Sequence, residues 1–188
     1  MGGHAPSHLS LRKVIILEQA SDGIRPRALS LFAREAQHEI GIRGEIHIRI
    51  TSNRELQELN LRFREKNQPT DVLSFPSDSG EIAGDIAISA EIAAANAVQL
   101  GHSIETELKI LIVHGLLHLA GYDHESDEGE MRSRETLLRH KFRLPVGLIE
   151  RVHGEQAARA KRSPRATQDS AASVNKSASR RDGQGRLS

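Results

Sequence analysis

Hydrophobic and polar positions along the chain repeat with two different periods, and each change of period predicts where a strand gives way to a helix. In "GEIHIRIT", residues 44–51, apolar side chains occupy every second position, which is typical of a strand with one buried face. His47 falls on the opposite face of this strand, so we expect it at the surface. Four strands are expected, at residues 12–19, 44–51, 69–76 and 84–89.

The segments between and after these strands carry apolar residues three or four positions apart, which predicts helices with one buried stripe. Ser52 is followed three residues later by Glu55, the pattern of a capping box, and Leu56 and Phe63 then fall on the core side of that helix. Five helices are expected, beginning at or just after Pro26, Ser52, Ser89, Ser103 and Ser126.

This order of elements predicts a single domain of the α+β (mixed α/β) class over residues 12–150, with a four-stranded mixed sheet packed by about five helices. Residues 1–11 are expected to form a flexible lead. Residues 151–188 carry nine Lys and Arg against three Asp and Glu and almost no large apolar side chains, so we expect a disordered tail. A basic tail either attaches loosely to RNA phosphates or only keeps the chain soluble, and charge does not decide between these roles.

The amino-acid composition limits the kinds of metal site and of cross-link that the chain can form. The chain has 188 residues and no cysteine, which excludes disulfides, thiolate zinc sites and iron–sulfur clusters, so any metal must be held by His, Asp or Glu. No run approaches the roughly 18 to 20 apolar residues that span a bilayer, and the first ten residues lack the features of a signal peptide. We therefore expect a soluble, cytoplasmic protein without membrane contact.

Three histidines lie within or directly after the most apolar stretch of the chain, in "HGLLHLAGYDH". His114 and His118 are four apart, so a helix presents both on one face. Gly121 can take the left-handed conformation that ends a helix and turns the chain, which returns His124 to the same point. The spacing predicts a metal site at the end of a central helix.

Three neutral nitrogen donors suit zinc and also tolerate other first-row divalent ions. Three protein ligands leave a fourth position for water, whose pKa zinc can lower to about 7, so the site is of a hydrolytic type. Metzincin proteases share this spacing but carry a glutamate base after the first histidine, where this chain has Gly115. Asp123 either helps as a base, orients His124, or only caps the turn that follows.

The motif "HGLLHLAGYDH" resembles the HGxLHLxGYDH signature of the YbeY family of bacterial endoribonucleases, also called rRNA maturation factors. Two upstream stretches, residues 59–76 and 84–89, agree with the same family, and the resemblance spans roughly residues 12–145. It implies a single-strand-specific, zinc-dependent endoribonuclease that acts in 16S rRNA 3′ end maturation, small-subunit assembly and ribosome quality control. The implied partners are single-stranded RNA, the rRNA precursor, the small ribosomal subunit and an assembly GTPase.

Carried across by motif, the metal ligands for one zinc ion per chain are His114, His118 and His124. Arg64 matches the functional arginine of the family, which implies a contact with phosphate or RNA. Asp85 and Asp123 are possible catalytic helpers. Thr70 and Asp71 lie in a matching motif but can equally serve only to fix a turn.

Two other functions remain open at the level of sequence. One is an assembly factor that binds rRNA or the ribosome and uses the metal mainly to stabilise its fold. The other is a metalloprotease whose usual glutamate base is replaced by a different carboxylate. For an endoribonuclease, the identity of the base and the choice between attack by water and attack by the substrate's 2′-hydroxyl also remain open.

Overall fold

The described part of the chain comprises residues 15–17, 23–78 and 80–145 of a computed structural model. The predicted lead at 1–11 and the predicted tail at 151–188 lie outside the described residues. Of the strand predicted at 12–19, residues 15–17 are described, and they are extended as expected.

The sheet is mixed and has the strand order β1-β2-β4-β3. Its strands are β1 (Ile15–Leu17), β2 (Glu45–Thr51), β3 (Val72–Pro76) and β4 (Ile82–Ser89). The pairs β1–β2 and β2–β4 are parallel, whereas β3 runs antiparallel to β4. The three longer strands form the body of the sheet, and β1 adds three residues along one edge.

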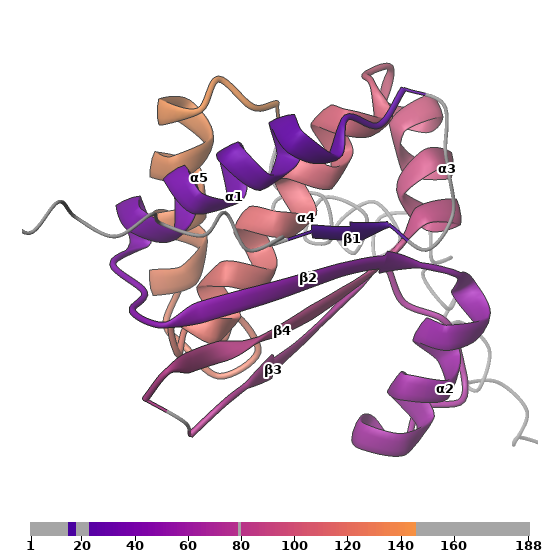
Figure 1. The fold of residues 1–188 in the computed structure, drawn as a ribbon, viewed down its shortest axis with the longest axis horizontal. Coiled ribbons are helices and arrows are strands. Elements are labelled where there is room, and N and C mark those ends of the chain that lie inside the picture. The colour runs from indigo at the N-terminus through magenta and orange to yellow at the C-terminus, as the bar shows by residue number, and fades with distance from the viewer. Residues whose placement is uncertain (1–14, 18–22, 79, 146–188) are drawn as a thin grey trace, which may run out of the picture.

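Helices cover the two faces of the sheet unequally. They are α1 (Pro26–Ile40), α2 (Asn53–Arg64), α3 (Ala90–Leu100), α4 (Ile104–Leu119) and α5 (Glu130–Lys141). Figure 1 shows α1, α4 and α5 on one side of the strands and α2 on the other. The prediction of one mixed α+β domain with about five helices is therefore confirmed.

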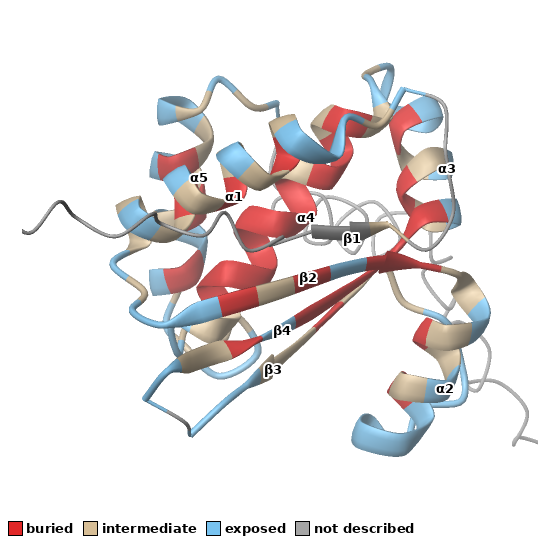
Figure 2. Cartoon of the chain, in the orientation of Figure 1, coloured by how far each residue is buried: buried red, intermediate tan, exposed pale blue. Residues whose placement is uncertain are grey.

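Helix α4 is the centre of the hydrophobic core. It packs against β3, β4, α1, α3 and α5, and Figure 2 shows it buried along most of its length. Leu111, Ile112 and Leu116 are each 0% exposed. Because α4 is covered on every side, it lacks the polar face of an ordinary surface helix. Among the described residues, no helix is long and apolar enough to cross a membrane.

The predicted helix starts are confirmed at three serines and wrong at a fourth. The hydroxyl groups of Ser52, Ser89 and Ser103 each accept a backbone N–H from the first turn of the following helix. The last helix begins at Glu130 instead of just after Ser126, because the Asp127 carboxylate accepts the backbone N–H groups of both Gly129 and Met131. The Ser126 hydroxyl donates instead to the Asp123 carboxylate, 2.9 Å away.

The prediction that Phe63 lies on the core side of its helix is also wrong. Leu56 is fully buried as expected, but Phe63, two turns further along α2, is 55% exposed. At this last turn the Phe63 ring packs against Phe75 of the edge strand β3, with ring centroids 4.9 Å apart. Periodicity identified the correct face of the helix but not the place where the core ends.

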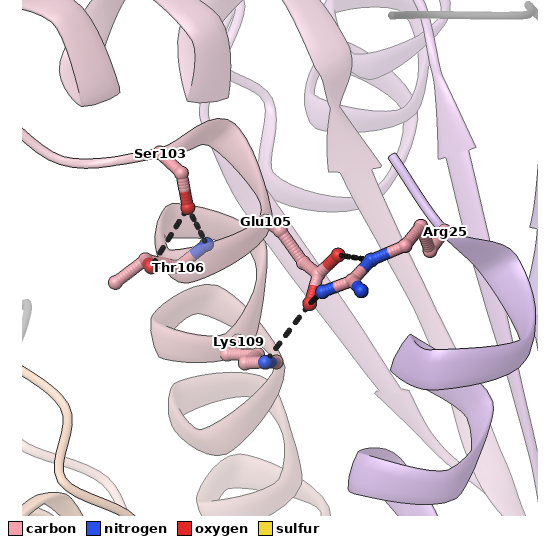
Figure 3. Close-up of polar contacts among 5 residues, drawn as sticks. All are labelled: Arg25, Ser103, Glu105, Thr106 and Lys109. Atoms are coloured by element: carbon pink, nitrogen blue, oxygen red, sulfur yellow. Dashed lines mark hydrogen bonds and ion pairs between the residues drawn. The ribbon is translucent and has the colours of Figure 1, made fainter. Parts of the chain in front are cut away.

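An ionic contact joins the start of α4 to the start of α1 (Figure 3). The Glu105 carboxylate, 8% exposed, accepts hydrogen bonds from Nε and Nη2 of Arg25 at 2.8 and 3.0 Å. Lys109, one turn further along α4, lies 3.0 Å from the same carboxylate. The pKa of Glu105 is lowered, mainly because of the hydrogen bond from Arg25. The effect of this hydrogen bond is larger than that of burial, which would raise the pKa.

Glu105→Gln is expected to lower the free energy of unfolding by roughly 1 kcal/mol near neutral pH, because Arg25 is 76% exposed and water screens the pair. A lowered pKa means that the folded state holds this proton more weakly than the unfolded state. The stabilisation is therefore complete above the ordinary value of 4.5 and is lost as pH falls through the lower folded-state value. Urea unfolding at neutral pH and near pH 3 should show the difference shrinking in acid.

The control is Glu58→Gln, which removes an exposed glutamate paired with Arg54 on α2 and should change stability less. A Glu105→Gln difference that is equally large at both pH values would contradict the role given to the carboxylate charge.

Candidate metal centre

The three motif histidines converge where α4 ends. His114 and His118 lie on the last turns of α4, and Gly121 has the left-handed φ of +88° that was predicted for it. The backbone N–H groups of Gly121 and Tyr122 donate to the carbonyls of His118 and Leu117, which closes the helix end. The chain then turns back and places the His124 ring 5.2 Å from that of His114, centroid to centroid.

The nitrogen atoms of this cluster fit a metal ion. One nitrogen from each ring lies within 4.8 Å of the others, and the Nε2 atoms of His114 and His118 are 3.2 Å apart. Two nitrogens bound tetrahedrally to zinc at its usual bond length stand about 3.3 to 3.4 Å apart. Nδ1 of His124 is buried without a hydrogen-bond partner among the described residues, which is a costly state, and a cation bound at that atom would relieve it. The three-histidine group can therefore hold a metal ion.

The local electrostatics favour the neutral imidazoles that a metal requires. Burial, followed by the proximity of His114 and His124, lowers the pKa of His118 to about 4. Burial is also the main cause of the lowered pKa of His124. Both rings are therefore neutral near neutral pH, and each has one nitrogen with a lone pair that it can offer to a cation.

Glu135 is a residue of this site that the sequence analysis missed. Its carboxylate, 3% exposed, lies on α5 with Oε1 3.1 Å from Nδ1 of His114. A proton on Nδ1, donated to the carboxylate, leaves the Nε2 lone pair of His114 directed toward His118. A signal was present, because Glu135 falls on the same face of its helix as the buried Met131 and Leu138. A charged residue within an apolar stripe indicates a buried partner.

The histidines form one wall of a groove of about 860 Å³, here called the histidine groove. Arg64, the last residue of α2, lies in the same groove, about half-exposed, with Nη2 3.7 Å from a carboxylate oxygen of Glu125. The tertiary structure thus brings a guanidinium to the groove from an element about 50 residues earlier in the chain. The groove also includes the predicted residues Thr70, Asp71 and Asp123.

Asp71 and Asp123 both hold turns in this groove. The Asp71 carboxylate accepts hydrogen bonds from the Thr70 hydroxyl and from the backbone N–H of Val72. The Asp123 carboxylate accepts the backbone N–H of Glu125 at 3.1 Å and then the Ser126 hydroxyl, and these bonds lower its pKa. Of the roles considered for Asp123, the structure shows the turn cap.

Asp85 is not brought to the histidines. Consecutive residues of a strand point to opposite faces, and Ile86 of β4 lies beneath Gly115 of α4. Asp85 therefore points to the other face, where its carboxylate lies 3.1 Å from Nδ1 of His47. Asp85, named above as a possible catalytic helper, does not line the histidine groove.

At Gly115, α4 lies so close to the sheet that a side chain has little room. A Cβ atom there would lie 3.0 Å from two side-chain carbons of Ile86 and 3.1 Å from the Ser74 hydroxyl. A glutamate at this position would have no room, and it would face the sheet instead of the histidines. The absence of the protease base is thus a packing requirement as well as a difference in sequence.

Comparison with known proteins decides the family. A family model described as Endoribonuclease YbeY matches residues 13–143. The chain belongs to the YbeY family. Its relatives include Endoribonuclease YbeY of Koribacter versatilis, 50% identical over 81% of this chain and all of the relative. Endoribonuclease YbeY of Solibacter usitatus is 47% identical over 73% of this chain and 93% of the relative. A solution structure from Thermotoga maritima is 28% identical, with a TM-score of 0.48, and covers 82% of this chain and 98% of that protein.

Glu135→Gln is expected to weaken the binding of added zinc, used here as the probe ion, about 10- to 100-fold in this YbeY-family chain, because the carboxylate no longer fixes and polarises His114. Competition with a chromophoric zinc chelator measures the affinity, and circular dichroism checks the fold. Glu130→Gln, which changes an exposed glutamate on the same helix, is the matched control. Equal zinc affinity in all three proteins would show that Glu135 does not support the site.

Gly115→Ala is expected to destabilise the protein by roughly 1 to 2 kcal/mol, although alanine is the better helix former. The reason is that the added methyl group would lie 3.0 Å from two carbons of Ile86, a side chain that is packed in the core and 1% exposed. In an Ile86→Ala background the same change should become neutral or stabilising. Urea unfolding of the four proteins tests this, and a penalty that persists without the Ile86 side chain would contradict the proposed contact.

Proposed function

We propose that this protein is a single-strand-specific, zinc-dependent endoribonuclease with one zinc ion held by His114, His118 and His124. The family match supports the class of reaction. The observation that carries the proposal to particular residues is the placement of Arg64 in the same groove as the three histidines. A site with three nitrogen donors and an adjacent guanidinium is suited to a phosphodiester.

Arg64 is suited to bind the phosphate at the bond that is cut. Negative charge grows on the nonbridging oxygens during cleavage, and a guanidinium can donate two parallel hydrogen bonds to them. Its partner in the structure, Glu125, lies 3.7 Å away and both side chains are about half-exposed, so a phosphate can replace this weak contact. A bound zinc ion would supply Lewis acidity toward the same phosphate.

Glu135 and Gly121 position the ligands and do not themselves react. Glu135 fixes the proton of His114 on Nδ1, and Gly121 turns the chain so that His124 faces the other two rings. Asp123 is a poor candidate for the general base, because its carboxylate already accepts two hydrogen bonds and its pKa is lowered.

The biological setting belongs to the same proposal and rests on the family resemblance. We propose 16S rRNA 3′ end maturation, small-subunit assembly and ribosome quality control as the roles, in the cytoplasm. The partners would be single-stranded RNA, the rRNA precursor, the small ribosomal subunit and an assembly GTPase. Within the chain, we propose residues 12–150 as the catalytic domain, preceded by a lead at 1–11 and followed by a basic tail at 151–188.

A structural role for the metal is the second candidate, and one observation favours it. His114 is 4% exposed and contacts the buried Glu135, so the metal site also joins α4 to α5. In an assembly factor this link would stabilise the fold without cutting RNA. Measurements of cleavage and metal content on the same variants separate the two functions.

Arg64→Ala is expected to reduce cleavage of single-stranded RNA about 100- to 1000-fold, the cost of losing a donor to developing negative charge, while zinc content stays at one ion per chain. His114→Ala should lose both zinc and cleavage. The control is Arg54→Ala on the same helix, where Arg54 is 89% exposed and pairs with Glu58. Labelled RNA, with analysis of the product ends, also distinguishes attack by water from attack by the 2′-hydroxyl.

Wild-type protein that binds zinc but cuts no RNA, or an Arg64→Ala variant that cuts at the wild-type rate, would favour the assembly factor with a structural metal.

A further inference from the structure

A second groove, of about 530 Å³, runs between α2 and the face of the sheet that α4 does not cover; we name it the α2 groove. Its volume lies within the range typical of small-molecule sites. Leu59 and Phe63 of α2 form one wall. The sheet contributes the other residues considered below, which are His47, Arg49, Phe75 and Asp85.

The α2 groove and the histidine groove meet at two aromatic rings. Phe63 and Phe75 line both grooves, and Arg64, next to Phe63 in sequence, lies in the histidine groove. An RNA strand whose phosphate sits between Arg64 and the histidines can therefore place a neighbouring nucleotide close to Phe63. Because the two grooves adjoin at these rings, another nucleotide of the same RNA is the occupant that best fits the α2 groove.

Phe63 has the properties of a surface on which a base stacks. It is 55% exposed, whereas the other large hydrophobic side chains that are exposed in the described part of the chain are aliphatic. Phe75 holds the ring from one side in an edge-to-face contact at 4.9 Å. The Arg62 guanidinium lies 5.2 Å from the ring centroid, and both arginine planes and aromatic rings stack with unpaired bases.

Polar side chains that also line the α2 groove can meet the edge of a base. His47 and Asp85 form a pair at 3.1 Å, with side chains 43% and 65% exposed. Arg49 lies 2.6 Å from a Glu55 carboxylate oxygen and is itself 49% exposed. Together they offer both donors and acceptors at the surface, as hydrogen bonding to a base edge requires. Asp85 thus lines the α2 groove beside His47 and does not line the histidine groove.

We propose that the α2 groove binds the base of an unpaired nucleotide next to the phosphate held at the histidine groove, with Phe63 as the stacking surface. The inference rests on the proposed endoribonuclease function and deepens it. A base within a duplex is already stacked on both faces, so only an unpaired nucleotide can insert. Selection for single strands would then come from an aromatic ridge beside the metal centre.

The first test uses Phe63→Trp, because the chain contains no tryptophan and the new indole is the sole reporter of its kind. A single-stranded 2′-O-methyl oligonucleotide, checked afterwards by electrophoresis for integrity, is titrated while tryptophan emission is followed. Stacking should quench the emission. Removing the base at one position of the oligonucleotide should abolish the quenching, whereas removal elsewhere should not, and a duplex should give none.

The second test measures binding of the same oligonucleotide to Phe63→Ala by fluorescence anisotropy. The loss of one stacked base should weaken binding roughly 5- to 150-fold, and removing the critical base should weaken binding to Phe63→Ala no further. Leu61→Ala is the matched control, because Leu61 is an exposed apolar residue on the same helix and does not line either groove. It should bind RNA like the wild type.

The outcomes separate this inference from the proposed function. Binding and position-specific quenching by a protein that cuts no RNA would support the base site and overturn the nuclease. Wild-type cleavage, with Phe63→Ala unchanged in KM and oligonucleotide affinity, would overturn the base site and leave the nuclease standing. Emission from Phe63→Trp that responds to a ribosomal protein but to no oligonucleotide would also overturn it, and would make the α2 groove a protein-docking surface.

Discussion

The close packing of α4 against the sheet at Gly115 is the constraint on which the rest of the structure depends. A helix covered on every side by β3, β4, α1, α3 and α5 must be apolar almost throughout, and it can approach β4 this closely only where a side chain is missing. The contact with Ile86 fixes the height and rotation of α4. It thereby fixes where His114 and His118 project and which side of β4 belongs to the metal centre.

Polar groups can be buried along such a helix only when they have partners. Both ends of α4 contain buried polar side chains that have such partners. At the start, Glu105 is held by Arg25 and Lys109 from the surface. At the end, His114 is held by Glu135, and His118 and His124 complete a nitrogen cluster that can hold a cation. The same burial that makes unpartnered rings costly also keeps His118 neutral, so the requirement of the core and the requirement of a metal site coincide.

The two faces of the sheet carry different groups of functional candidates. Because side chains alternate along β4, Ile86 supports α4 while Asp85 faces the α2 groove. Helix α2 lies at the boundary, with Arg64 in the histidine groove and Phe63 lining both. In the proposed enzyme, the groove on one side would hold the phosphate and the groove on the other an adjacent base, so one helix end would align the RNA with the metal centre.

The sequence by itself determined the features that depend on neighbours a few residues apart. These are the helix or strand character of each element, the N-terminal caps at Ser52, Ser89 and Ser103, and the turn at Gly121 that brings His124 back to the other two histidines. The tertiary structure decided what depends on partners from distant elements. The pairing of Glu135 with His114, the opposite face taken by Asp85, and the end of the core before Phe63 are of this kind. Local spacing fixes the face of a helix or strand on which a side chain lies, but only packing between elements fixes what that face meets.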